Sequence, residues 1–141
     1  MKRLLPGVLL ACTSLVAFVF LHHVYGLVPI RCNESLTSYS GLRTESNVLC
    51  WITGWTDYSA YFRFHESDEW AQNSAKKKDM KYLGVMSQER CIGASAEMNP
   101  WWFNIGENSR GDCWQLTMSS FRHILFYDSA SQVSLLRSFS W

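Results

Sequence analysis

Val48-Leu49-Cys50-Trp51-Ile52 is the stretch of sequence that best indicates the fold. It is a continuous apolar run rich in residues that favour β-strands, and turn-forming residues bound it at Ser46-Asn47 and Thr53-Gly54. A strand that is apolar on both faces is typical of the interior of a parallel sheet, where other elements cover both sides. The run therefore predicts a buried strand of an α/β fold.

The segments that follow predict two helices and a second strand. Thr56 to Gln72 is amphipathic and aromatic, which favours a helix. Met80 to Met86 predicts a strand that neighbours the first in parallel, and Glu107 to Tyr127 predicts another helix because apolar residues recur there at helical spacing. That apolar stripe consists of Trp114, Met118, Phe121 and Leu125. Strand, helix, strand and helix in this order begin an α/β unit, while Val133 to Phe139 fits either a short strand or a helical turn.

The N-terminal region predicts insertion into the secretory membrane. Lys2 and Arg3 precede an uncharged apolar run from Leu4 to Leu21, and roughly 20 apolar residues span a bilayer as a helix. The next basic residue is Arg31, so the positive-inside rule places the N-terminus in the cytosol and the rest in the lumen. A cleaved signal peptide, with its cleavage site at Val24-Tyr25-Gly26, is the alternative; the length of the run favours an uncleaved anchor.

These features divide the chain into three parts. Residues 1–27 are predicted to form a cytosolic tail and signal anchor, residues 28–46 a polar stem, and residues 47–141 one lumenal domain. The lumenal part is too short for two ordinary domains. The formal net charge of +1, without a long basic or acidic tract, argues against a nucleic-acid partner.

The cysteines beyond the apolar run predict a disulfide framework. They are even in number and would lie in an oxidising compartment, which favours two disulfides, with every connectivity left open by the spacing. These candidates are Cys32, Cys50, Cys91 and Cys113. No CxxC pair and no histidine at ligand spacing indicate a zinc site. Asn33 heads the only N-glycosylation sequon, Asn33-Glu34-Ser35, and is the predicted glycan acceptor.

Three stretches, taken in order, resemble a known enzyme family. Val48-Leu49-Cys50-Trp51, followed by Trp70-Ala71-Gln72, is similar to a VLCW-like strand and a TWA-like helix end. Tyr82 to Glu89 is similar to a strand that ends in a phrase like LFMSSE, and Glu107 to Thr117 resembles E-G-R-x-x-L-W-x-K-T at the start of a helix. Together they resemble the N-terminal portion of the core 1 β1,3-galactosyltransferases, over most of the lumenal part.

The resemblance implies a fold, a location and an activity. The fold is of the GT-A type, an α/β sheet with covering helices that binds a sugar nucleotide at the ends of its strands. The location is that of a single-pass type II membrane protein of the Golgi or ER. The activity is transfer of galactose from UDP-galactose to O-linked N-acetylgalactosamine, with Mn²⁺ as the implied cofactor because a hard cation stabilises the diphosphate leaving group.

On this interpretation, the candidate nucleotide contacts are Ser87, Glu89 and Arg110. Ser87 and Glu89 follow a predicted strand, where open α/β sheets present ligand contacts. Arg110 stands at the start of a predicted helix, where a cation and free backbone N–H groups favour a phosphate. The plainer alternatives are a turn at Ser87 and Glu89, and an ion pair of Arg110 with Glu107 or Asp112.

The chain also departs from the family pattern. Asn73 and Ser74 stand where the family has a cysteine, so the resemblance implies that Cys91 or Cys113 pairs with Cys50 instead. No Asp-x-Asp motif exists in the chain and no general base is identifiable, so no catalytic or metal-ligating residue is assigned. The resemblance therefore implies a form that is truncated before the motif and inactive alone, with an open sheet edge for a protein partner or dimer. The alternative function is a small, disulfide-stapled secreted or lumenal protein that acts by binding.

Overall fold

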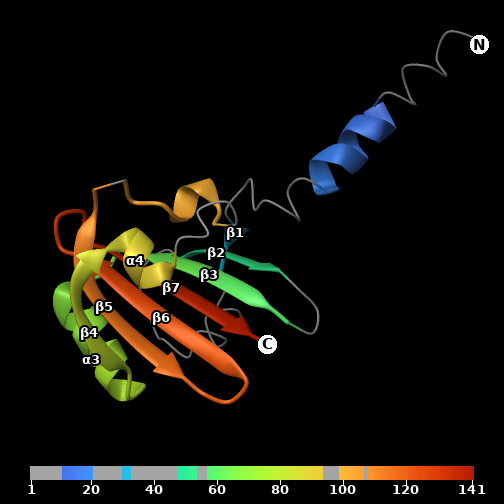
Figure 1. The fold of residues 1–141 in the computed structure, drawn as a ribbon. Helices are drawn as coiled ribbons and strands as arrows, with labels where there is room; N and C mark the ends of the chain where they lie inside the picture. The colour runs from blue at the N-terminus through green and yellow to red at the C-terminus, as the bar shows by residue number, and fades with distance from the viewer. Residues whose placement is uncertain (1–10, 21–29, 33–47, 54–56, 94–98, 107) are drawn as a thin grey trace, which may run out of the picture.

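The computed structural model of the chain describes residues 11–20, 30–32, 48–53, 57–93, 99–106 and 108–141 (Figure 1). Most of these residues belong to one antiparallel sheet of seven strands in the order β1-β2-β3-β7-β6-β5-β4. The strands are β1 (Ile30–Arg31), β2 (Leu49–Thr53), β3 (Ser59–Phe64), β4 (Lys81–Ser87), β5 (Arg110–Thr117), β6 (Phe121–Asp128) and β7 (Val133–Ser140). The sheet is accompanied by α3 (Asp68–Lys77), α4 (Gln88–Ile92) and the 3-10 helix η1 (Trp101–Phe103).

Strand β7 occupies the middle of the sheet. It pairs with β3 on one side, where Leu136 lies opposite Phe62, and with β6 on the other, where Leu136 lies opposite Leu125. Beyond β6 follow β5 and β4, and beyond β3 follow β2 and β1. Strands β1 and β4 are therefore the outer strands of the sheet in the described part of the chain.

Both faces of the sheet are covered. On one face α3 packs over a core that includes Phe62 and Trp114, and on the other α4 and η1 pack over a core that includes Tyr61, Phe103 and Phe126 (Figure 1). Successive side chains of a strand point to opposite faces, so Tyr61 and Phe62 belong to different cores although they are neighbours in sequence. The sheet is thus the middle layer of three.

The four candidate cysteines form two disulfides, as predicted. Cys32–Cys50 joins the residue after β1 to β2, and Cys91–Cys113 joins α4 to β5. The expectation that Cys50 pairs with Cys91 or Cys113 is wrong. The reason is that β1 lies beside β2 in the sheet and brings Cys32 next to Cys50.

The two predicted strands exist as β2 and β4, but their predicted parallel arrangement is wrong. Strands β3, β7, β6 and β5 lie between them, and every pair of neighbouring strands is antiparallel in the described sheet. The apolar run in β2 indicates cover on both faces, and helices supply that cover here for an antiparallel sheet. A sheet with covering helices is therefore found, with a different strand orientation.

The two predicted helices are wrong over most of their length. Thr56 to Gln72 contains β3 and only the beginning of α3, and Glu107 to Tyr127 contains β5 and β6, with a bend at Ser119 and Ser120 between them. Strands covered on both faces carry apolar residues at consecutive positions, so some of these residues fall at helical spacing without a helix. Val133 to Phe139, which the sequence left open, belongs to strand β7.

Helix α3 begins at a side-chain cap. Ser67 is its N-cap, and the Ser67 Oγ accepts a hydrogen bond from the backbone N–H of Trp70 at 3.2 Å. Acidic residues in the first turn and lysines in the last turn complement the helix dipole. Trp70-Ala71-Gln72 therefore lies in the first half of a helix, and not at the helix end that the resemblance implied.

The predicted membrane anchor and stem fall largely outside the described residues. Residues 11–20 are helical, whereas 1–10, 21–29 and most of the stem, with Asn33, lie outside. Among the described residues, no helix has the length and apolar character that spanning a membrane requires. The anchor, the cleavage alternative and the glycan at Asn33 stay predictions.

Candidate anion-binding groove

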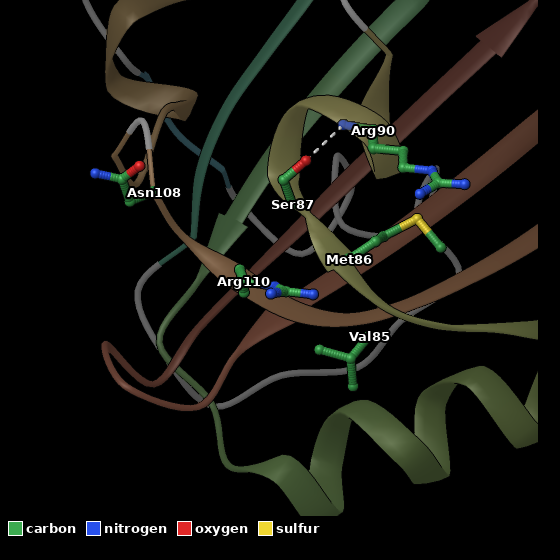
Figure 2. A pocket seen from close by; sticks show the side chains of 6 residues that line it. All are labelled: Val85, Met86, Ser87, Arg90, Asn108 and Arg110. Atoms are coloured by element: carbon green, nitrogen blue, oxygen red, sulfur yellow. Dashed lines mark hydrogen bonds between the residues drawn. The ribbon is translucent and has the colours of Figure 1, made fainter.

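A groove with a volume of about 330 Å³ lies at the outer edge of the sheet, where β4 ends and β5 begins (Figure 2). Its lining residues come from β4, from α4 and from the start of β5. They are Val85, Met86, Ser87, Arg90, Asn108 and Arg110. The groove combines two guanidinium groups with the apolar side chains of Val85 and Met86, and no lining residue is a carboxylate.

Local structure brings these side chains together. Ser87 lies directly opposite Arg110 in the antiparallel pairing of β4 with β5. Ser87 is also the N-cap of α4, and its Oγ accepts a hydrogen bond from the backbone N–H of Arg90 at 3.3 Å (Figure 2). The chain therefore turns from β4 into α4 within the groove, and the Cys91–Cys113 disulfide fixes the next residue of α4 to β5.

Strand β5 needs a glycine beside this groove. A Cβ atom at Gly111 would lie 1.9 Å from the carbonyl oxygen of Tyr127, far inside van der Waals contact. Only glycine lets β5 run so close to β6 at this point. The backbone of Arg110, one residue earlier, is held by this close approach and by its pairing with Ser87.

Of the predicted site residues, the structure brings two together. Ser87 and Arg110 both line the groove, whereas Glu89 is exposed on α4 and does not line it. Arg110 begins a strand, so its predicted place at the start of a helix is wrong. Sequence reasoning missed Arg90 and Asn108. A serine that ends a strand and caps a helix would have signalled Arg90, because the third residue after the cap lies in the first helical turn.

Among the described residues, Asp112 does not form the predicted ion pair with Arg110. The carboxylate of Asp112 instead accepts a hydrogen bond from the Tyr82 hydroxyl at 2.5 Å. This hydrogen bond, together with burial and the charge of Asp112, raises the pKa of the Tyr82 hydroxyl. Glu107, the other predicted partner, lies outside the described residues.

The groove has the donors that anions need. A guanidinium group keeps its charge at physiological pH and presents N–H donors in a fork that matches a phosphate, sulfate or carboxylate. For a metal ion, no group of three histidine, cysteine or acidic side chains gathers in the part of the chain that the structure describes. The Mn²⁺ that the resemblance implies stays a prediction.

A second polar pair lies inside the sheet. His123 of β6 and Ser138 of β7 are opposite each other, both buried, and the His123 Nδ1 and Ser138 Oγ share a hydrogen bond of 2.6 Å. Burial, with a smaller contribution from the charge of Lys78, lowers the pKa of His123 from 6.5 to about 4. Because both side chains are buried, the pair stabilises the pairing of two strands and is not a candidate catalytic site.

The low pKa of His123 predicts that stability depends on pH. Above pH 6.5 the imidazole is neutral in both states, and its contribution is fully present. As the pH falls from 6.5 towards 4, the unfolded chain takes up a proton that the folded chain excludes, so stability is lost. We expect the free energy of unfolding to fall by about 2 to 3 kcal/mol between pH 7 and pH 4.5 because of His123.

Urea unfolding at several pH values measures this cost. Other groups also titrate in this range, so the quantity of interest is the difference between the wild-type slope and that of His123→Asn. The variant is expected to be less stable at pH 7 and to lose less stability on acidification. Equal slopes for the two proteins would show that His123 titrates normally.

The groove with its arginines is the candidate functional site. It combines one predicted pair of residues, Ser87 and Arg110, with a second guanidinium group from Arg90. No family model, no curated protein and no solved structure matches the chain.

Proposed function

We propose that this chain is an extracytoplasmic binding domain, stapled by disulfides, whose groove between β4, α4 and β5 holds an anionic group of its ligand. The observation that carries the proposal is the pair of guanidinium groups, from Arg90 and Arg110, in one groove without a lining carboxylate. In Figure 2 both arginine side chains extend beside Met86. Because both side chains line the same groove, an anion bound there is attracted by both positive charges.

Preorganisation supports binding at this place. Arg110 extends from a strand paired on both sides, and Arg90 extends from a helix fixed by the adjacent Cys91–Cys113 disulfide. Both side chains are exposed, so solvent screens each contact and the affinity for a single small anion is modest. The apolar stretch of Val85 and Met86 adds contact area for the part of the ligand that carries the anion.

The second candidate is the galactosyltransferase-like function. What favours it is that Ser87 and Arg110, two of the expected nucleotide contacts, line the same groove, where the diphosphate of UDP-galactose would be the anion. A GT-A-like fold, a Golgi or ER location, a type II anchor and Mn²⁺ all belong to this candidate. Strand β5 weighs against it, because the resemblance implies the start of a helix at Arg110, where the structure has a strand.

A protein partner is compatible with either candidate. Strand β4 is an outer strand of the sheet that the described residues form, and its side chains Tyr82, Leu83 and Val85 are exposed. Outer strands with free backbone groups are the usual place for another chain to pair. A partner or a second copy would join the sheet here, next to the arginines.

Inorganic pyrophosphate and UDP test the groove directly. We expect both to bind the full chain with affinities on the order of millimolar, since two exposed guanidinium groups supply most of the attraction. Arg110→Gln and Arg90→Gln should each weaken binding by about 3- to 10-fold, or ~0.7–1.4 kcal/mol. Isothermal titration calorimetry or NMR titration measures these changes.

Lys77→Gln is the matched control, because Lys77 is exposed on α3, which covers one face of the sheet away from the groove lining. It removes the same charge and should leave binding unchanged. Unaltered binding in Arg90→Gln and Arg110→Gln would contradict the proposal. Much tighter binding of UDP than of pyrophosphate, together with turnover of UDP-galactose on a GalNAc-peptide in Mn²⁺, would establish the transferase in its place.

A further inference from the structure

A row of alternating arginine and aromatic side chains lies across β3, β7 and β6. The guanidinium carbon of Arg137 is 5.5 Å from the ring centre of Tyr61 and 5.1 Å from that of Phe139. The guanidinium carbon of Arg122 is 5.6 Å from the ring centre of Phe139 and 5.8 Å from that of Trp141. We call the row Tyr61, Arg137, Phe139, Arg122 and Trp141 the arginine–aromatic ladder.

Strand register builds the ladder. Tyr61 lies opposite Arg137 in the pairing of β3 with β7, and Arg122 lies opposite Phe139 in the pairing of β6 with β7. Arg137 and Phe139 are two residues apart on one strand, so their side chains lie on the same face. Arg122 also pairs with Thr117, at the opposite end of β5 from Arg110, so the ladder and the groove are separate sites.

The arginines of the ladder lack a compensating acid. Neither Arg122 nor Arg137 forms an ion pair with a carboxylate from the described residues, and the Nε of each is buried without a hydrogen-bond partner there. Arg137 donates one hydrogen bond, from Nη1 to the carbonyl oxygen of Ile92 at 3.1 Å. Both guanidinium carbons lie within 6 Å of the Phe139 ring centre, so two like charges are held close together.

The geometry leaves particular surfaces for a ligand. The guanidinium carbons lie over aromatic rings, and the terminal N–H groups of Arg122 remain as donors for a ligand. Arg122, Arg137 and Phe139 are half-buried, whereas Trp141 is 54% exposed. The ladder thus offers charged donors next to a wide, accessible aromatic ring.

We propose that the arginine–aromatic ladder binds an acidic carbohydrate, a sugar chain that carries sulfate or carboxylate groups. Sulfates and carboxylates match the two arginines, and a sugar ring stacks on the exposed face of Trp141. An extended acidic peptide fits less well, because β3, β6 and β7 are paired on both sides and offer no backbone edge for a peptide strand. This site is independent of the proposed function of the groove.

A sulfated hexasaccharide derived from heparin is the probe, with a neutral hexasaccharide of glucose as its uncharged comparison. The full chain, with its disulfides intact, should bind the sulfated sugar and lose affinity as salt is added, because the contacts are charged. Arg122→Gln should weaken binding about tenfold, and Arg122→Lys less, since lysine keeps the charge without the planar fork. Fluorescence anisotropy of a labelled sugar measures the affinities.

Two controls separate the ladder from general charge. Lys76→Gln and Lys77→Gln each remove one positive charge from the last turn of α3, outside both the ladder and the groove, and should bind the sugar as the wild type does. Trp141→Ala removes an exposed ring without opening the core, and a loss of binding in this variant supports the ladder even if Arg122→Gln is unstable.

Four outcomes would overturn the proposal, and three of them concern how the ladder itself binds. These three are absence of binding to the sulfated sugar, equal weakening in Arg122→Gln and Lys77→Gln, and equal affinity for a hexapeptide of glutamate. The last outcome would mean that the ladder recognises negative charge in any form. Loss of sugar binding in Arg110→Gln alone would assign the sugar to the groove.

Discussion

Trp114→Ala is expected to lower the free energy of unfolding by about 3 to 5 kcal/mol, the range for large-to-small changes in a core. Trp114 lies in β5, only 7% exposed, within the core beneath α3, and its ring centre is 5.6 Å from that of Tyr82. Alanine would leave a cavity between the helix and the sheet that neither can close. Urea denaturation with linear extrapolation measures the loss.

Trp101→Ala is the matched control. The same side chain is 69% exposed at Trp101, so the same substitution there should cost less than about 1 kcal/mol. Similar losses for the two variants would mean that α3 does not cover β5 as described. Both variants replace tryptophan with alanine, so a difference in stability between them reports how α3 packs on β5.

Removing the Cys91–Cys113 disulfide should cost about 2 to 5 kcal/mol, as loss of a native disulfide from a small domain does. The double variant Cys91→Ala/Cys113→Ala opens a loop with a sequence separation of 22 residues and frees α4 from β5. Because Arg90 precedes Cys91 in α4, we also expect weaker binding of pyrophosphate in the groove. Unfolding and titration experiments on the same variant measure the two effects.

Cys12→Ala serves as the control for cysteine chemistry, since Cys12 is free and exposed. It should change neither stability nor binding. A double variant that loses stability but binds pyrophosphate like the wild type would show that the disulfide supports the fold without positioning Arg90. A double variant that is as stable as the wild type and binds as well would show that the disulfide neither stabilises the fold nor positions Arg90.

The sequence predicted where β2 and β4 lie better than how the strands are arranged. The apolar run at Val48 to Ile52 and the segment Met80 to Met86 became β2 and β4 within a residue at each end. Burial was correctly inferred for β2, where Cys50 and Trp51 are buried, but it does not distinguish a parallel from an antiparallel sheet once helices cover both sides. Orientation depends on contacts such as β3 with β7, between residues far apart in sequence, which local periodicity does not record.

The candidate groove was predicted in part, and partly for a mistaken reason. Ser87 was proposed because it follows a strand, and it does line the groove, since a strand end and a helix start coincide there. Arg110 was proposed because it was expected at the start of a helix. It instead lies opposite Ser87 in the antiparallel pairing of β4 with β5. The ladder is not visible in sequence, because cross-strand register creates it, and finding Arg90 required recognising Ser87 as the N-cap of a short helix.

The central place of β7 has a consequence for synthesis. Strands β1 to β3 emerge from the ribosome early, whereas β7, which joins them to β6, is made after every other strand of the described sheet. Until then β3 and β6 have no common neighbour, and the nascent chain carries two incomplete sheets with open edges. We expect a chaperone to hold this intermediate, and a stop codon before Val133 to leave the two halves unable to combine.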